Sequence, residues 1–161
     1  MDSSVCRESL ATLIAQESAA LGELASLLEH EHELLLKNEV AALESAMEKR
    51  QECTGKLVRV EDERRSLCRV HGHAVDLDGL ERLLAWCDAQ GSLKARWAEC
   101  ATRARRCRDL NDKNSALVNA RMKRVESLLE VLTGKAGGAL TYGPQGASSV
   151  PRAGRVLTAE A

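Results

Sequence analysis

Residues 3–36 read SSVCRESLATLIAQESAALGELASLLEHEHELLL. Aliphatic residues recur every seven positions in this stretch, in two adjacent rows. The rows are Leu13, Ala20, Leu27, Leu34 and Ile14, Leu21, Leu28, Leu35. At 3.6 residues per turn, this spacing places both rows on one side of a helix. No proline interrupts the stretch, and Ser3 or Ser4 is expected to cap its amino end. The stretch therefore predicts one long helix whose apolar face must be covered by other helices.

A second helix is predicted from Asn38, which is placed to cap it, to about Val70, where His71-Gly72-His73 ends it. Its inward-facing residues are expected to be Val40, Leu43, Met47, Cys53, Leu57, Val60 and Leu67. The pattern favours a helix that packs against the first one, because its apolar residues also keep a helical spacing.

Two more helices are predicted after the second. A short one fits residues 77–89 and ends at Gly91. Its apolar set is Leu80, Leu83, Leu84 and Trp86. Ser92 opens the longest helix, which runs to about Thr133. Its sevenfold row is Trp97, Ala104, Val118, Val125 and Leu132, beside a row of Cys100, Cys107 and Leu128.

The predicted fold is all-α: an elongated antiparallel helical bundle or coiled coil of three long helices and one short helix, over residues 1–134. Residues 1–37 contain seven acidic and two basic residues, whereas residues 92–134 contain five acidic and ten basic residues. This opposite charge favours placing the first and last helices side by side. Residues 135–161 are predicted to form a flexible tail, because they hold both prolines and five of the eleven glycines.

Composition limits the possible functions. The formal net charge is −1, so no overall field attracts nucleic acid or an anionic membrane. The six cysteines include no CxxC pair, and the chain starts without a signal-peptide pattern, so we expect a reducing, cytoplasmic setting. No uncharged apolar run is long enough to cross a bilayer, and we expect no membrane insertion.

The residues with catalytic or metal-binding potential give no strong pattern. Glu29 and His32 have the spacing of a carboxylate and imidazole pair in di-iron bundles, but such a site needs a second copy and two further glutamates. We therefore expect both to be solvated charges on a polar face. Cys68, His71 and His73 are expected to mark an ordinary helix end rather than a metal site. With no phosphate loop or nucleophile motif, we predict no enzyme, catalytic residue, metal or cofactor.

The last predicted helix contains two polar features. Arg103, Arg105, Arg106 and Arg108 could form a nucleic-acid stripe, but they are spread around the helix and lack aromatic neighbours for base stacking. A charged face opposite the acidic first helix is the favoured interpretation. Asn111 and Asn114 fall within the apolar rows, where amides either fix the register of the bundle or face a partner.

Beyond Asn114 the helix stays strongly amphipathic. Its apolar residues are Leu117, Val118, Met122, Val125, Leu128, Leu129 and Leu132. If the other helices leave this part uncovered, it is a docking stripe for a partner helix; if they cover it, it is ordinary core.

Several motifs together resemble the FlgN family of flagellar export chaperones. They are Leu110-Asn111-x-x-Asn114 with Leu117-Val118, the stripe to Leu132, and Leu140-Thr141-Tyr142-Gly143-Pro144-x-Gly146, with weaker likeness at Glu33–Lys37 and Glu48-Lys49-Arg50. This chain departs from the family at Pro144 and Gln145, where other residues can follow Tyr-Gly. Members are small cytoplasmic helical proteins that hold the hook-filament junction (hook-associated) proteins before export through the flagellar type III apparatus.

The resemblance implies two binding sites. The first would bind the carboxyl-terminal helix of a junction protein through Asn111, Asn114, Leu117, Val118, Met122, Val125, Leu128, Leu129 and Leu132. The second would dock on the cytoplasmic domain of the export gate through Tyr142, Gly143 and Pro144. Two other classes stay open: a generic coiled-coil scaffold or adaptor, and, less favoured, a nucleic-acid binder that uses the four arginines.

Overall fold

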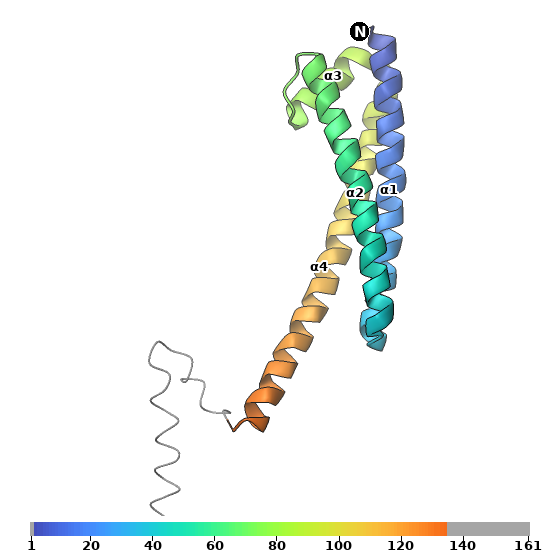
Figure 1. Ribbon diagram of the computed structural model, residues 1–161. Coiled ribbons are helices and arrows are strands. Elements are labelled where there is room, and N and C mark those ends of the chain that lie inside the picture. Colours follow the sequence, from blue (N-terminus) through green and yellow to red (C-terminus); the bar gives the residue numbers. More distant parts are fainter. Residues whose placement is uncertain (1, 135–161) are drawn as a thin grey trace, which may run out of the picture. The chain divides into compact units, whose positions relative to one another are not determined.

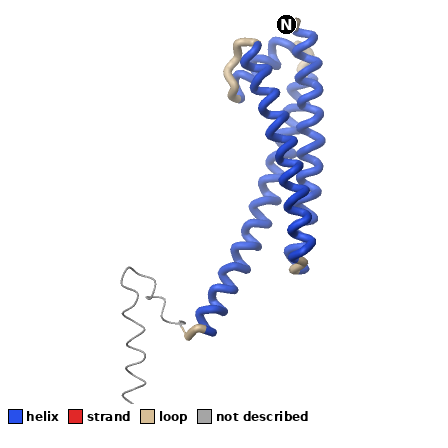
Figure 2. Tube along the Cα trace, in the orientation of Figure 1, coloured by secondary structure: helices blue, strands red, loops and turns tan. Residues whose placement is uncertain are grey.

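The computed structural model describes residues 2–134, and its regular structure in this range is helical throughout (Figures 1 and 2). The helices are α1 (Ser3–Lys37), α2 (Val40–Val70), α3 (Leu77–Cys87) and α4 (Ser92–Leu132). The all-α prediction is confirmed, and each predicted helix end lies within two residues of the observed one. Internal contacts divide the chain into two units, Met1–Ser115 and Ala116–Ala161, which are described separately below. The division predicted at Gly134 falls at the last described residue and stays a prediction.

α1 and α2 run in opposite directions, side by side (Figure 1). Three ion pairs follow this order along the two helices, because residues that come later in α1 meet residues that come earlier in α2. They are Glu17 with Arg64 at 2.8 Å, Glu23 with Lys56 at 3.2 Å and Glu31 with Arg50 at 3.3 Å. The pairs align the two helices, while burial of the apolar rows supplies most of the stabilisation.

The turn between α1 and α2 corrects the role predicted for Asn38. Asn38 has a left-handed backbone with φ of 59° and ends α1, and Glu39 is the residue that precedes α2. The amides of Asn38 and Glu39 donate to the carbonyls of Leu35 and Leu34, at 3.3 and 3.1 Å. Asn tolerates the left-handed conformation better than most residues, so it serves here as a carboxyl-terminal cap. At the start of α1 the cap is Asp2 rather than Ser3 or Ser4, and the Ser4 hydroxyl donates to its carboxylate.

α4 lies parallel to α1 along its first part, in a fixed register. Three buried α4 side chains donate to α1 backbone carbonyls, and each of these donors lies 86 residues after its acceptor. The pairs are Cys100 Sγ with Ile14 O at 3.6 Å, Cys107 Sγ with Leu21 O at 3.3 Å and Asn114 Nδ2 with Leu28 O at 2.9 Å. We call this series the carbonyl ladder. Its members are short side chains that reach the neighbouring backbone, so the two helices approach closely.

The carbonyl ladder shows which row of α4 faces the core. Leu93, Cys100, Cys107 and Asn114 are its buried residues, so the row predicted through Cys100 and Cys107 is the one that faces the core. Ala104 of the other predicted row is exposed and does not face the core, whereas the exposure of Val118 is the one expected of an uncovered docking stripe. Sevenfold spacing alone does not tell which of two adjacent rows points inward when both contain small or apolar residues.

The core is closed at one end by α3, which lies where α1 begins and α2 ends (Figure 1). Leu80, Leu83 and Leu84 are buried there among residues of the other helices. Trp86, predicted to be in this apolar set, is instead 48 % exposed, and its ring lies 5.1 Å from the ring of His71. Val40 and Met47 of α2 are also more than half exposed, contrary to the prediction that they face inward.

Asp88 caps the amino end of α4, a role that the sequence analysis missed. Its carboxylate is buried and accepts from the amides of Leu93 and Lys94, at 2.7 and 3.3 Å. It also accepts from the Ser92 hydroxyl and lies 3.5 Å from the Arg7 guanidinium. Burial alone would raise the pKa of this carboxyl, but the hydrogen bonds that it accepts together lower the pKa below 3.8. The charged form is therefore the one that the fold stabilises.

All six cysteines are free and buried. Burial is the main cause of a raised pKa at each of these thiols, and it raises the pKa of Cys6 to about 12. The thiols therefore act as small packing groups and are poor nucleophiles in the folded protein, and Cys100 and Cys107 also donate in the carbonyl ladder.

Candidate functional site

The carbonyl ladder ends in a polar cluster at Asn114, which is only 5 % exposed. The amide group of Asn114 donates to the Leu28 carbonyl, so its Oδ1 faces the other way and lies 2.9 Å from His32 Nδ1. Because Oδ1 can only accept, the proton of this hydrogen bond is on His32 Nδ1. Asn114 thus has a partner for both ends of its amide, which supports its interpretation as a residue that fixes register.

Glu31 and Arg50 complete the polar cluster. Glu31 is buried, and its Oε1 lies 3.3 Å from Arg50 Nε. Another nitrogen of Arg50 donates to Asn111 Oδ1 at 3.3 Å. Burial raises the pKa of Glu31, while Arg50 and a hydrogen bond from Asn114 oppose the rise. The cluster links α1, α2 and α4 at the point where the buried row of α4 stops.

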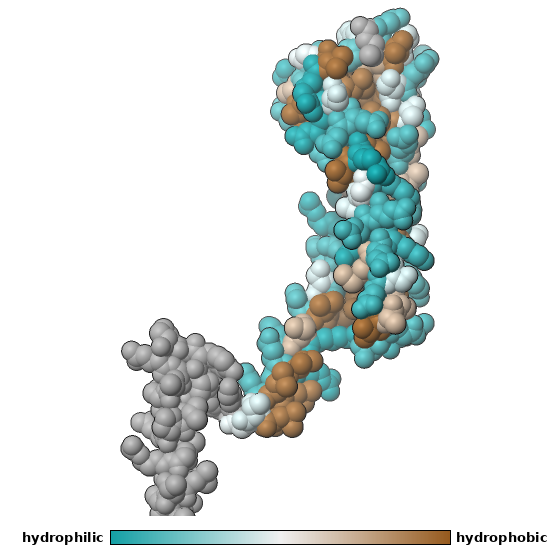
Figure 3. Space-filling view, viewed as in Figure 1, coloured by the Kyte–Doolittle hydropathy of each residue, from teal (hydrophilic) through white to brown (hydrophobic). Residues whose placement is uncertain are grey.

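Apolar residues of α4 beyond the cluster are exposed. Their exposed fractions range from 42 % for Val118 to 81 % for Leu132, and Leu117 is half-buried; the others are Met122, Val125, Leu128 and Leu129. Val131, which the sequence analysis did not select, is 66 % exposed. We call these eight residues the apolar stripe. In Figure 3 hydrophobic colour gathers over this last described part of α4. Several large apolar side chains together in water are characteristic of a binding surface.

Most of the exposed residues group on one side of the helix. Val118, Met122, Val125, Leu129 and Leu132 follow one another at steps of three or four, so they share one face. Leu117 and Leu128 flank this face, whereas Val131 lies about 140° round the helix from its centre, near the opposite side. Val131 belongs to the apolar segment LLEVL at residues 128–132. Sevenfold spacing does not select it, because it lies off the main row.

The predicted site residues therefore fall into three groups. Asn111 is exposed and accepts from Arg50, whereas Asn114 is buried in the cluster. The leucines, valines and methionine from residue 117 onward form the apolar stripe. Tyr142, Gly143 and Pro144 lie outside the described residues.

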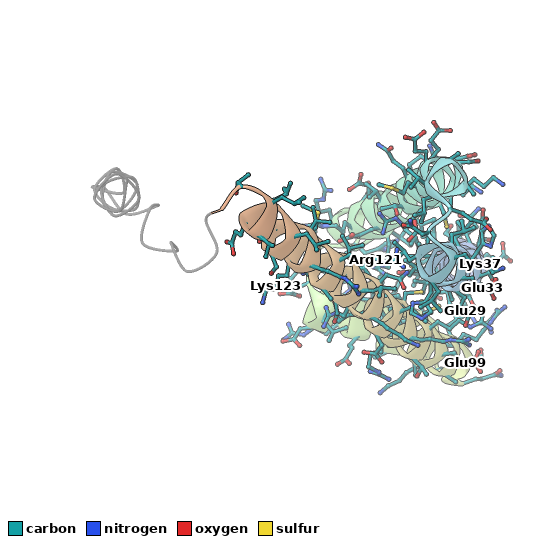
Figure 4. The ribbon with its side chains drawn as sticks, turned by 90° about the horizontal axis from the view of Figure 1, so that it is seen from below. Glu29, Glu33, Lys37, Glu99, Arg121 and Lys123 are labelled. Carbon is teal, nitrogen blue, oxygen red and sulfur yellow. The ribbon has the colours of Figure 1, made fainter. Side chains whose placement is uncertain are left out.

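The alternative chemical sites are resolved as structural contacts. Glu29 pairs with Arg106, and it projects from α1 near Glu33 and Lys37 (Figure 4). His32 is half-buried and bonds to Asn114, so its predicted place on a solvated polar face is wrong. His71 packs on Trp86. Within residues 2–134, no three His, Cys, Asp or Glu side chains are placed to ligate a metal.

Two of the four arginines, Arg103 and Arg106, contact the acidic first helix, which agrees with the favoured interpretation for these two residues. Arg106 pairs with Glu29, and Arg103 donates to the Ser18 carbonyl at 3.0 Å. Arg105 donates to Thr102 on its own helix.

In the part of the chain that the structure describes, no helix is both long and apolar enough to span a membrane.

These features define a class: an all-α protein that packs a tightly registered bundle and presents an apolar helix face to solvent. A family model described as FlgN protein matches residues 1–149, and the chain belongs to this family. The resemblance drawn from the sequence is thereby confirmed, and with it the general role of a flagellar export chaperone. Searches among curated proteins and solved structures return no significant match.

Proposed function

We propose that this protein is a cytoplasmic, non-enzymatic chaperone that binds the carboxyl-terminal helix of hook-filament junction proteins. The apolar stripe is the observation that carries the proposal. A secreted subunit whose terminal helix exposes an apolar face is prone to premature assembly, and a second amphipathic helix can cover that face. The stripe offers five apolar side chains on one helical face for this purpose. Asn111 borders the surface, whereas the burial of Asn114 assigns it to the support of the helix rather than to client contact.

Calorimetry with a peptide from the carboxyl-terminal helix of a junction protein tests the proposal. We expect Leu129→Asp to weaken binding by about ten- to a hundredfold, because burial of a leucine side chain is worth about 1.5–3 kcal/mol. Ala120→Asp is the matched control, since Ala120 is exposed on the side of α4 opposite Leu129. No binding by the unaltered protein at hundreds of micromolar would refute the client assignment and favour a generic scaffold.

We also propose that residues 142–144 dock on the cytoplasmic domain of the export gate. The support is the family resemblance of this segment and the chemistry of tyrosine, whose ring is a rigid anchor and whose hydroxyl forms one directed hydrogen bond. In this mechanism the chaperone needs no ATP, since docking at the gate competes with client retention and favours release.

Tyr142→Ala is expected to leave the client affinity and the helix content unchanged while it weakens binding to the purified gate domain. Tyr142→Phe separates the two contributions, because it keeps the ring and removes only the hydroxyl. Pull-down and calorimetry with the gate domain measure the effect. A loss of client binding in Tyr142→Ala would show that the tyrosine belongs to the client site instead.

A further inference from the structure

A groove opens on the first unit, between α2 and α4, with a volume of about 580 Å³. Leu24 and Leu28 of α1, Met47 of α2 and Cys107 of α4 provide its apolar lining. The groove belongs to residues 24–111 and shares no residue with the apolar stripe. Its volume falls within the usual range for binding pockets, which is about 300–1,000 Å³.

α2 and α4 meet along a seam that α3 covers at one end of the bundle, and the groove lies at the uncovered part of this seam. α2 and α4 are joined by Arg64, whose guanidinium lies 4.3 Å from the Trp97 ring centre, and by Arg50 with Asn111. Beside the first of these contacts, Leu80 of α3 packs close to Cys68 and Trp97. Near the second contact, no helix among the described residues covers the seam, and Met47 is 51 % exposed. The bundle is thus four-helical at the α3 end and three-helical at the groove.

The charges around the groove favour an acidic occupant. Arg50 and Arg108 both line it, and no acidic side chain does. Arg50 is already paired with Glu31, whereas Arg108 has no ion-pair partner within residues 2–134. The tail of this chain fits poorly, because residues 135–161 contain three basic residues and one acidic residue. A carboxylate beside an apolar side chain would match both the lining and the free arginine.

We propose that the groove accepts a short amphipathic helix of the client, with carboxylates flanking its apolar face, as the missing fourth helix of this end. The inference rests on the proposed function, since it assigns to the client a second contact besides the apolar stripe. The groove buries the apolar side of the added helix against Leu24, Leu28 and Met47, and Arg108 pairs with a client carboxylate.

The methionines allow the two contacts to be observed separately. The chain has three methionines: Met1, Met47 in the groove and Met122 in the apolar stripe. In protein labelled with ¹³C at the methionine methyl groups, Met47→Leu and Met122→Leu assign the signals. Titration with the full-length junction protein is expected to shift both the Met47 and Met122 signals. A shift of Met122 alone overturns the groove proposal and leaves the chaperone function intact; no shift and no heat of binding overturn both.

Charge reversal gives an independent measurement. Arg108→Glu is expected to weaken affinity for the full-length junction protein by about two- to fivefold, the range of one exposed ion pair, and to reduce its dependence on salt. Lys113→Glu is the matched control, because Lys113 is an exposed α4 residue outside the groove. Equal affinities for the two variants overturn the ion pair assigned to Arg108.

The same spectra also test two other possible occupants of the groove, a second copy of the protein and its own tail. A Met47 signal that moves with protein concentration in the absence of the junction protein shows that a second copy fills the groove. A Met47 signal that moves when residues 135–161 are deleted shows that the tail fills it. Either result overturns the assignment of the groove to the client.

Discussion

Single buried polar residues determine where α4 begins and where its core-facing row ends. Asp88 fixes the beginning, because it accepts from two amides of the first turn that no helical carbonyl can satisfy. Asn114 fixes the end of the row, because it donates to the Leu28 carbonyl of α1 and orients His32. Neither residue exposes more than 5 % of its surface. Both residues therefore fix the position of α4, and the effect of replacing them is measurable as a change in the free energy of unfolding.

The folding stability is expected to depend on the ionisation of Asp88. Its folded pKa lies below 3.8, so the carboxylate contributes stability above the unfolded pKa, and this contribution is lost as the pH falls through the folded pKa. Asp88→Asn should cost about 1 kcal/mol near neutral pH, typical of a lost cap, and the difference from the unaltered protein should shrink below pH 3.8. Urea unfolding as a function of pH measures this difference.

The control for Asp88 is Asp109→Asn, which alters an exposed carboxylate in the middle of α4. Near neutral pH this variant should differ from the unaltered protein by no more than about 0.5 kcal/mol in the free energy of unfolding. The assignment of the cap would be wrong if Asp88→Asn lost no stability at neutral pH, or if its deficit persisted unchanged into acid. The pH dependence contributed by Glu31 has the opposite sign to that of Asp88. Burial raises the pKa of Glu31, so protonation of this carboxyl relieves part of the cost of burying it.

At the scale of the element, α4 packs on α1 through side chains that donate to backbone, and this arrangement makes the last rung of the carbonyl ladder vulnerable. Asn114→Ala leaves the His32 ring without its partner and removes the second hydrogen bond of the Leu28 carbonyl, which keeps its helical one. An unsatisfied buried polar group costs about 1–3 kcal/mol, so this loss is expected in the free energy of unfolding measured with urea. Asn119→Ala is the control, because Asn119 is exposed on the same helix and should change stability by no more than about 0.5 kcal/mol. Equal effects of the two variants would contradict a supporting role for Asn114.

The helices themselves were predictable from the sequence, because uninterrupted sevenfold rows with few breakers have no good alternative to long helices. Caps were less predictable. Asn38 and Asp88 both lie in short turns, and the choice between ending one helix and starting the next depends on backbone angles that composition does not set. The exposure of Met47 and Trp86 could not be predicted either, because it depends on where the other helices end and not on the residue itself.

The candidate site was predicted in outline for a similar reason. An apolar row from Leu117 to Leu132 is compatible with either a docking stripe or ordinary core, and the exposure seen in the structure decides between them. Asn111 and Asn114 looked equivalent in sequence, at neighbouring positions of one stripe. Contact with Leu28 and His32 separates them, and such contacts between residues distant in the chain are invisible to periodicity.

For the molecule as a whole, the two units are expected to differ in local stability. Amides of residues 93–114 lie in a helix with a buried row, whereas residues 116–132 carry mostly exposed side chains. Helices with few buried contacts open more readily. Hydrogen exchange should therefore be at least about tenfold faster in residues 116–132 than in residues 93–114. This ratio corresponds to an opening free energy that is lower by about 1.4 kcal/mol. Addition of the client peptide should slow exchange in that segment; uniform protection along α4 before addition would contradict this expectation.

The constant spacing of the carbonyl ladder restricts how the length of this chain can vary among related proteins. Insertion of one residue between Ile14 and Leu28 would turn the following part of α1 by about 100° and misalign every later rung. A gain or loss of seven residues, matched in α1 and α4, would restore the pairing, and the antiparallel α2 would need the same change. Within the bundle, tolerated insertions and deletions should therefore come in whole heptads, whereas the turns that join the helices can change one residue at a time.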